Sequence, residues 1–216
     1  MKLFRVSAIA LACSLLSYTS TIVAEEAEFQ PTIDVSILAG TSGSSSFESL
    51  DKDDYTLDTD SGTNFAVSFN YLQRYLNGSR LQYELYLAQT ETDLVIKDAA
   101  SNDKTTSPMD IQYFHIGGVN EVETDNSDFV PYLGASIGAT AFKPDDYDSE
   151  TEFSLGINAG VKWFATESMG ARLDLRAIGT VIDSDSKIFC NGGCIATVDG
   201  SMWWQYQAAV GFFARF

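Results

Sequence analysis

The chain has 216 residues, of which 45% are hydrophobic, and its formal net charge is −17 at neutral pH. The length allows one or two domains. A strongly acidic surface repels phosphate backbones, which argues against nucleic acid as a partner. After the first segment, no apolar run approaches the ~20 residues of a transmembrane helix. A membrane location would therefore require a closed β-barrel, since only closure satisfies the hydrogen bonds of every strand.

The first segment has the features of a secretory signal. Lys2 and Arg5 form a charged start, an apolar run follows, and small residues precede the acidic pair that begins at Glu25. We expect a signal peptide at 1–24 and the mature domain at 25–216. Removal of these two basic residues would change the net charge from −17 to −19.

The rest of the chain alternates between apolar and polar residues, with the period of two that is typical of β-strands. About eight such segments of roughly ten residues are present, the length that a tilted strand needs to cross a bilayer. They lie near residues 33–40, 64–72, 80–90, 109–122, 129–142, 153–164, 169–182 and 203–216. We predict an all-β protein, an eight-stranded antiparallel up-and-down transmembrane β-barrel.

The connections between these segments alternate in length, as expected for long extracellular loops and short periplasmic turns. The long ones are polar and acidic, including residues 41–63, 91–108 and 143–151. Aromatic residues gather where the strands meet each rim, which indicates two interfacial girdles. A soluble lipocalin-like barrel or sandwich remains the alternative, but such a fold gives no reason for aromatic residues at both ends.

The last strand carries the most specific resemblance. One of its faces is apolar and ends in Phe212 and Phe216, preceded by Gly211. With the signal peptide and the strand pattern, the chain resembles the small outer-membrane barrels of the OmpA transmembrane-domain and opacity-protein-like porin family. That resemblance implies a Gram-negative outer-membrane location, a monomer, and a terminal strand read by the barrel-assembly machinery. Ala214 stands where such signals often have an aromatic residue.

The predicted inward faces carry charged residues of both signs. An unpaired charge away from water is costly, so we expect a paired network that holds a polar lumen shut. The alternative is a gated narrow channel in which these pairs open and reform. The residues of this predicted lumen charge network are Asp34, Glu84, Lys162, Arg172, Asp174, Arg176 and Arg215.

His115 is the only histidine. Outer-membrane hydrolases use a histidine with a serine and an acid, in which the base activates the nucleophile. No serine stands two residues after His115, and Ser136 or Ser68 would meet it only through the strand register. We therefore expect no catalytic residues and no enzyme, and a lipid-modifying activity stays a remote alternative.

The sequence contains three cysteines. Ala10, Leu11 and Ala12 precede Cys13, with no leucine at the place that a lipidation motif requires, so we expect Cys13 to be removed with the signal. Cys190 and Cys194 would then lie in an oxidising compartment, where a disulfide is the default. The intervening Asn-Gly-Gly lets the chain fold back tightly, and two thiols are too few for a metal site.

The long loops contain clustered carboxylates but lack the glycine and closing glutamate of an ordered calcium loop. We expect no cofactor and no bound metal, although divalent ions would bridge such loops to lipopolysaccharide phosphates. Loops on a rigid scaffold are also where an extracellular ligand would bind. We therefore predict a structural and surface-interaction protein in contact with outer-membrane lipid and lipopolysaccharide, with a narrow porin-like channel for small solutes as the alternative.

Overall fold

The protein was analysed as a computed structural model. The structure describes residues 32–45, 47–48, 55–76, 78–98, 104–122, 124, 128–145, 148–182, 187–190, 194–197 and 202–216. The predicted signal peptide at 1–24 lies outside these residues and remains a prediction.

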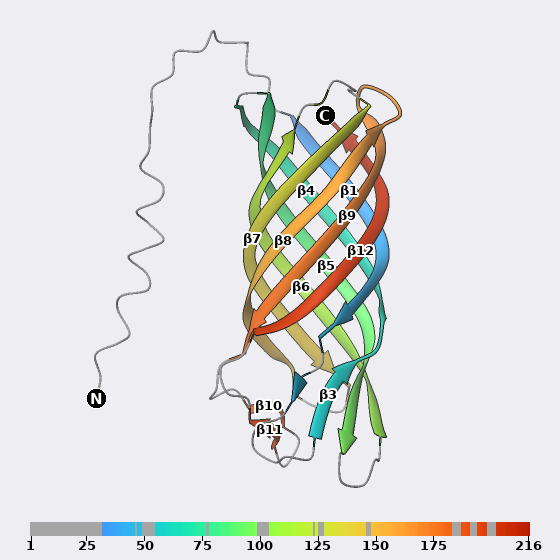
Figure 1. The fold of residues 1–216 in the computed structure, drawn as a ribbon, viewed down its shortest axis with the longest axis vertical. Helices are drawn as coiled ribbons and strands as arrows, with labels where there is room; N and C mark the ends of the chain where they lie inside the picture. Colours follow the sequence, from blue (N-terminus) through green and yellow to red (C-terminus); the bar gives the residue numbers. More distant parts are fainter. Residues whose placement is uncertain are drawn as a thin grey trace, which may run out of the picture. The chain divides into compact units, whose positions relative to one another are not determined.

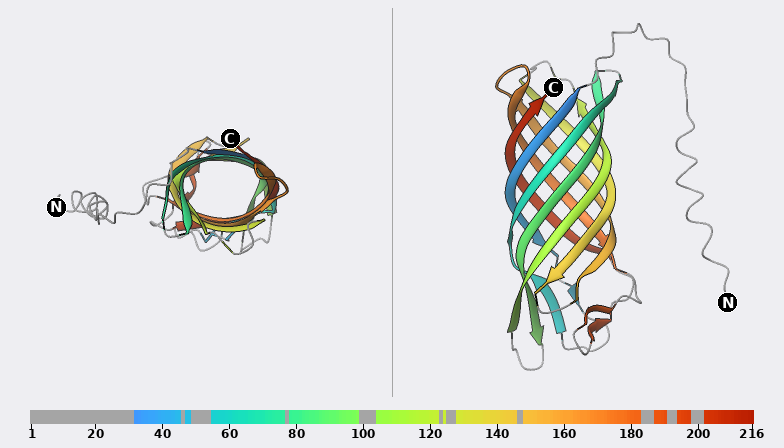
Figure 2. Two further views of the ribbon diagram at one scale, coloured as in Figure 1. Left: turned by 90° about the horizontal axis from the view of Figure 1, so that it is seen from above. Right: turned by 180° about the vertical axis from the view of Figure 1, so that it is seen from behind.

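Eight long antiparallel strands form a closed barrel (Figures 1 and 2). Each pairs with its neighbours in the sequence, and the first pairs with the last, so the topology is up-and-down as predicted. The barrel strands are β1 (Ile33–Ser44), β4 (Gly62–Tyr75), β5 (Ser79–Asp98), β6 (Lys104–Val122), β7 (Phe129–Pro144), β8 (Glu150–Phe164), β9 (Met169–Val181) and β12 (Met202–Arg215).

Short strands extend one end of the barrel (Figure 1). β2 (Phe47–Glu48) pairs with β3 (Tyr55–Thr59), and β3 adds to the outer part of β5. β10 (Lys187–Cys190) and β11 (Cys194–Thr197) form a separate hairpin. Its register places Cys190 opposite Cys194. Their side chains lie outside the described part of the structure, so the disulfide stays a prediction.

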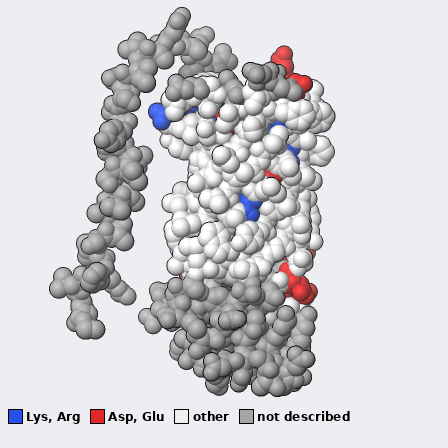
Figure 3. All heavy atoms as spheres, in the orientation of Figure 1, with Lys and Arg blue, Asp and Glu red and all other residues white. Residues whose placement is uncertain are grey.

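The period-two pattern separates a lipid-facing surface from an interior, as predicted. On β12, Val210 and Phe212 are 63% and 79% exposed, whereas the alternate residues Gln207 and Phe213 are only 4% and 2% exposed. The same alternation holds on β9 and β4. Figure 3 shows that the barrel wall on this face carries few acidic or basic residues. An apolar outer wall is what a strand in contact with lipid requires.

The strands reach further than the sequence pattern predicts at the long-loop end. β5 continues to Asp98 and β6 begins at Lys104, with a continuous register between them. Residues 91–108, expected to be a loop, are therefore mostly in paired antiparallel strands, and β7 and β8 reach into both ends of 143–151. The backbone ladder continues through stretches that are largely polar, with Leu94 and Val95 as buried apolar residues on β5.

The opposite end carries the short turns and the C-terminus (Figure 1). Gly78 adopts a positive φ of 76° in the turn between β4 and β5, a conformation that glycine accepts without steric cost. Short turns mark the periplasmic side of outer-membrane barrels, so the long-loop end is extracellular. Among the described residues, no helix has the length and apolarity needed to cross a membrane.

The seam between β1 and β12 depends on Gly211, which lies opposite Leu38. A Cβ atom at Gly211 would collide with the backbone of Ile37 and Leu38, whereas one at Gly43, on the same seam, would meet nothing within 4 Å. Gly211→Ala should lower the free energy of unfolding by about 1–3 kcal/mol through overpacking. Gly43→Ala should leave it unchanged. Urea unfolding in micelles, followed by tryptophan fluorescence, measures both, and equal midpoints for the two variants would contradict the assignment.

Candidate functional site

The lumen gathers the charged residues that the sequence pattern assigns to the inward faces. Asp34, Lys162 and Arg172 are at most 1% exposed, and Glu84, Asp174 and Arg176 at most 4%. Arg215 is partly exposed near the periplasmic end. All seven point inward because each shares the phase of buried neighbours on its strand. They form two layers, which we call the middle layer and the periplasmic layer.

The middle layer is centred on Arg172 of β9. Its Nε donates to the Tyr132 hydroxyl at 2.8 Å, and its Nη1 donates to Ser68 at 2.7 Å and Ser36 at 3.2 Å. Its Nη2 donates to Asp174 at 2.8 Å and Glu84 at 3.0 Å. One guanidinium group thus joins β9 to β1, β4, β5 and β7 across the inside of the barrel.

Arg176 shares the same two carboxylates. Its Nη2 donates to Glu84 at 2.7 Å, and its Nε donates to Asp174 at 3.4 Å. Its guanidinium carbon lies 3.7 Å from the centre of the Tyr86 ring, in the geometry of a cation–π contact. Two arginines and two carboxylates therefore form a neutral cluster, in which each charge has partners of the opposite sign.

The periplasmic layer is built around Asp34 and Glu121. Lys162 donates to Asp34 at 2.6 Å and also to Glu121. Arg215 grips Asp34 with two donors, each at 2.7 Å, and reaches Glu121 at 3.0 Å. Arg80 adds a weaker contact, 3.6 Å from Glu121. This layer crosses the lumen at the end that carries the C-terminus.

Two members of this layer were missed in the sequence. Glu121 follows in phase after Tyr113 and His115, which the strand pattern already places inward, so extending the alternation would have found it. Arg80 is the second residue of β5, so close to the strand's start that the alternation does not show on which face its side chain lies. The predicted network has four basic residues and three carboxylates. Glu121 adds a fourth carboxylate, so the two kinds of charge are equal in number.

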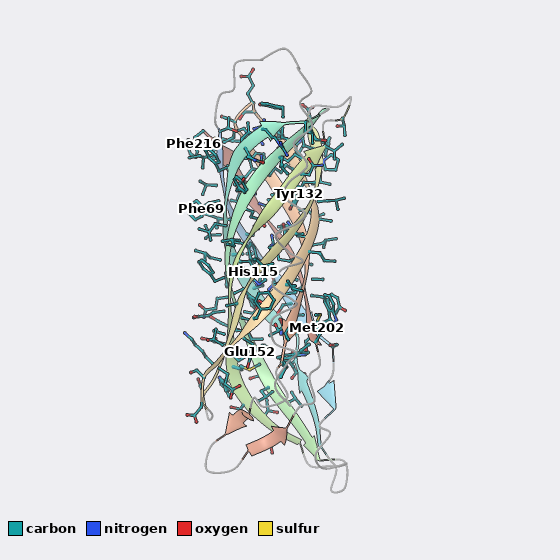
Figure 4. All side chains as sticks on the ribbon, turned by 90° about the vertical axis from the view of Figure 1, so that its left-hand side faces the viewer. Phe69, His115, Tyr132, Glu152, Met202 and Phe216 are labelled. Atoms are coloured by element: carbon teal, nitrogen blue, oxygen red, sulfur yellow. The ribbon has the colours of Figure 1, made fainter. Side chains whose placement is uncertain are left out.

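His115 lies fully buried inside the barrel (Figure 4). Its Nδ1 is 3.1 Å from the Ser136 hydroxyl and its Nε2 is 3.0 Å from the Ser154 hydroxyl. The strand register brings Ser136 to the ring, whereas Ser68 bonds to Arg172 instead. Both ring nitrogens are thus engaged by hydroxyl groups, and no hydrogen bond to a carboxylate orients the ring among the described residues.

The extracellular end of the interior combines apolar and uncharged polar side chains. Phe142 stacks on Trp203 with ring centres 5.1 Å apart, and the Trp203 indole donates to the Ser45 carbonyl at 2.8 Å. Nearby, Asn64 donates to the Thr90 hydroxyl at 3.0 Å, so polar side chains continue through the lumen to this level. The buried apolar side chains near this end include Leu94, Val95, Met109, Ile111, Ile178 and Ile182.

The predicted assembly signal lies on the outer wall. Phe212 and Phe216 are 79% and 75% exposed near the periplasmic end, where Figure 4 shows Phe216, and Gly211 lies in the seam with β1. The acidic residues 51–54 lie outside the described residues. In the part of the chain that the structure describes, no group of three or more His, Cys, Asp or Glu side chains is arranged to hold a metal ion.

The comparison that decides the family is with the model for the outer membrane protein beta-barrel domain, which matches residues 8–215. The chain belongs to this family of outer-membrane β-barrels. Membership fixes its location in the outer membrane, which agrees with the closed barrel and apolar wall described above. No curated protein is significantly similar to the chain in sequence.

Solved structures of this barrel type share the fold at low sequence identity. Neisserial surface protein A is 13% identical, with a TM-score of 0.58 over 87% of this chain and all of that one. The outer membrane protein OprG from Pseudomonas aeruginosa is 14% identical, with a TM-score of 0.60 over 86% of this chain and 95% of that one. At such identities the likeness concerns the fold alone.

The middle layer generates a prediction about stability. Arg172→Met should lower the free energy of unfolding by about 3–5 kcal/mol, because it leaves buried carboxylates with too few cationic partners. The free energy of unfolding of Arg172→Lys should lie between those of the natural protein and Arg172→Met, since lysine keeps the charge but loses the forked donors. Arg74→Met, at an exposed position of β4, is the control and should change little. Urea unfolding in micelles measures these differences. An unfolding midpoint of Arg172→Met equal to that of the control would show that the network contributes nothing to stability.

Proposed function

We propose that this protein is a structural and surface-interaction protein of the outer membrane, with a closed lumen and extracellular loops that meet external partners. The observation that carries the proposal is the middle layer, in which Arg172 binds residues of four other strands. An eight-stranded barrel has an interior just wide enough for side chains to fill. Ion pairs that join several strands and fill the lumen favour a rigid structural barrel over a transport channel.

The contacts argue against an open path through the barrel. The middle layer contains charges held by two or more hydrogen bonds each, and the periplasmic layer repeats this arrangement one level below. Opening either layer would separate buried opposite charges, which costs several kcal/mol for each ion left unpaired. The alternative, a narrow channel for small solutes, would require both layers to rearrange together.

The surroundings of His115 support a protein without enzymatic activity. A histidine that activates a serine needs an acid that orients the ring and a substrate that can reach the serine. Here Ser136 and Ser154 contact the two ring nitrogens, no carboxylate among the described residues bonds to the ring, and the His115 side chain is inaccessible to solvent. We infer that His115 packs the lumen and that this barrel performs no lipid chemistry.

The extracellular rim supplies the surface for interaction. Asp148, Glu150 and Glu152 stand at the start of β8, beyond the apolar band. Partial burial and the neighbouring negative charges raise the pKa of the Glu150 carboxyl. A divalent cation would relieve this repulsion and bridge the carboxylates to lipopolysaccharide phosphates at the same level. An external ligand would bind at this acidic rim.

The test measures binding of fluorescent lipopolysaccharide to the refolded barrel in micelles, with and without Mg²⁺. We expect Mg²⁺ to increase binding by the natural protein. The increase should fall by about threefold or more when Asp148→Asn, Glu150→Gln and Glu152→Gln are combined, since the loss of one good ionic contact changes affinity by about that factor. Glu167→Gln, which removes one charge on the periplasmic turn, is the control. Equal Mg²⁺ dependence in all three proteins would contradict the proposal.

A further inference from the structure

A groove crosses the lipid-facing wall of the barrel from β1 to β8. It lies on the outside, because Phe114 in its lining is 53% exposed, whereas His115, the next residue on β6, is fully buried. Membrane hydrocarbon therefore meets this groove directly. The outward side chains that line it include Ile37 of β1, Phe65 of β4, Leu87 of β5, Phe114 of β6, Ala139 of β7 and Thr151 of β8.

One end of the groove lies nearer the periplasm and the other lies at the extracellular rim. Ile37 is close to the periplasmic start of β1, whereas Thr151 is the second residue of β8, at the extracellular end. Between them the lining residues pair across successive strands, as Ile37 does with Val67 and Ala141 with Thr151. Because barrel strands are tilted, a line of such pairs climbs the wall obliquely.

The lining changes from apolar to polar along this path. Towards the extracellular side, Leu87 gives way to Gln89 on β5, and Phe114 gives way to Gln112 on β6. The hydroxyl-bearing Thr151 stands at the same polar end. A ligand that matches this lining is apolar over most of its length and polar where it reaches the extracellular rim.

Over β7 the groove has short side chains between two large ones. Ala139 pairs with Phe114 on β6 and with Phe153 on β8, and the two rings are 53% and 52% exposed. Ala141 continues the same face of β7 towards the extracellular rim. Methyl groups between exposed rings leave room for a hydrocarbon chain to pack against all three strands.

The polar end of the groove carries a positive charge. Lys143 follows Ala141 on the outward face of β7, and its Nζ donates to the side-chain oxygen of Gln112 at 2.8 Å. Asp110 lies opposite Lys143 in the register, but its carboxylate accepts from the Gln89 amide at 3.2 Å. Among the described residues no carboxylate forms an ion pair with Lys143. The exposed ammonium group therefore keeps two donors for an anion beside the groove.

We propose that this groove holds an acyl chain of lipid A, the phosphorylated and acylated glucosamine lipid of the extracellular leaflet, and that Lys143 binds one of its phosphates. A lysine stem lies along apolar surface while its ammonium group reaches the headgroup level and binds phosphate through charge-assisted hydrogen bonds. A phospholipid of the periplasmic leaflet would present its phosphate at the other end of the groove, where the lining is apolar. The site does not rest on the proposed surface function, because that function joins carboxylates to phosphates through a divalent cation and Lys143 needs none.

The first experiment measures binding of hexa-acylated, bisphosphorylated lipid A to the refolded barrel in micelles by native mass spectrometry, with EDTA present. EDTA removes the divalent cations on which binding at the acidic rim depends. We expect lipid A to bind without Mg²⁺, and about fivefold more weakly to Lys143→Gln, the effect of one lysine at an anionic lipid surface. Lys143→Arg should keep the affinity. Arg74→Gln, which removes an exposed charge at the periplasmic end of β4, is the control and should also keep it.

Two outcomes of this experiment would overturn the proposal. One is equal affinity of Lys143→Gln and the natural protein, and the other is binding that occurs only with Mg²⁺. The second outcome would leave the acidic rim as the place of lipid contact. Unchanged Mg²⁺ dependence in the rim variants would instead contradict the surface proposal alone, so the two proposals fail separately.

A matched pair of variants tests the groove separately from the charge. Ala141→Phe fills the groove with a ring and should lower the affinity for lipid A although Lys143 is still present. Ala208→Phe enlarges an exposed side chain of β12 outside this groove and should leave the affinity unchanged. Both positions face lipid, so both variants should fold, which a heat-shifted gel band checks. Equal affinity of the two variants, or a dimer of the barrel in place of the lipid adduct, would overturn the proposal.

Discussion

The fold depends on pairing the charges that an eight-stranded barrel places inside. Arg172 illustrates the constraint, because its guanidinium group is buried and bonds to Ser36, Ser68, Glu84 and Tyr132 on four other strands. None of these bonds is local in sequence, so the cluster forms only when the sheet has closed. Burial makes each charge expensive alone and the complete set stable, which couples ring closure to the interior network.

The two layers join different strands at different levels along the barrel axis. The periplasmic layer joins the first and last strands of the barrel, since Arg215 near the end of β12 holds Asp34 near the start of β1. The middle layer braces the centre of the membrane span. Beyond it, the Phe142–Trp203 stack and uncharged polar pairs such as Asn64–Thr90 fill the extracellular end. An interior filled in this way suits a rigid support for surface loops.

Sequence reasoning found the barrel and most of its charged interior, because period-two alternation determines the face on which a side chain lies. It does not determine which inward residues meet. The contacts of His115 with Ser136 and Ser154 depend on the register of β6, β7 and β8, and the role of Tyr132 depends on distances across the barrel. The extension of β5 and β6 was missed because its few apolar residues, such as Leu94 and Val95, stand in consecutive positions and do not alternate with polar ones.

The central claim is that the ion network closes the lumen, and conductance tests it most directly. The purified protein is refolded and inserted into a planar bilayer, with a heat-shifted gel band as the control for folding. The account predicts a silent bilayer, because no ion passes two layers of paired charges without breaking them. Discrete current steps from folded protein would contradict it and identify the barrel as a narrow channel.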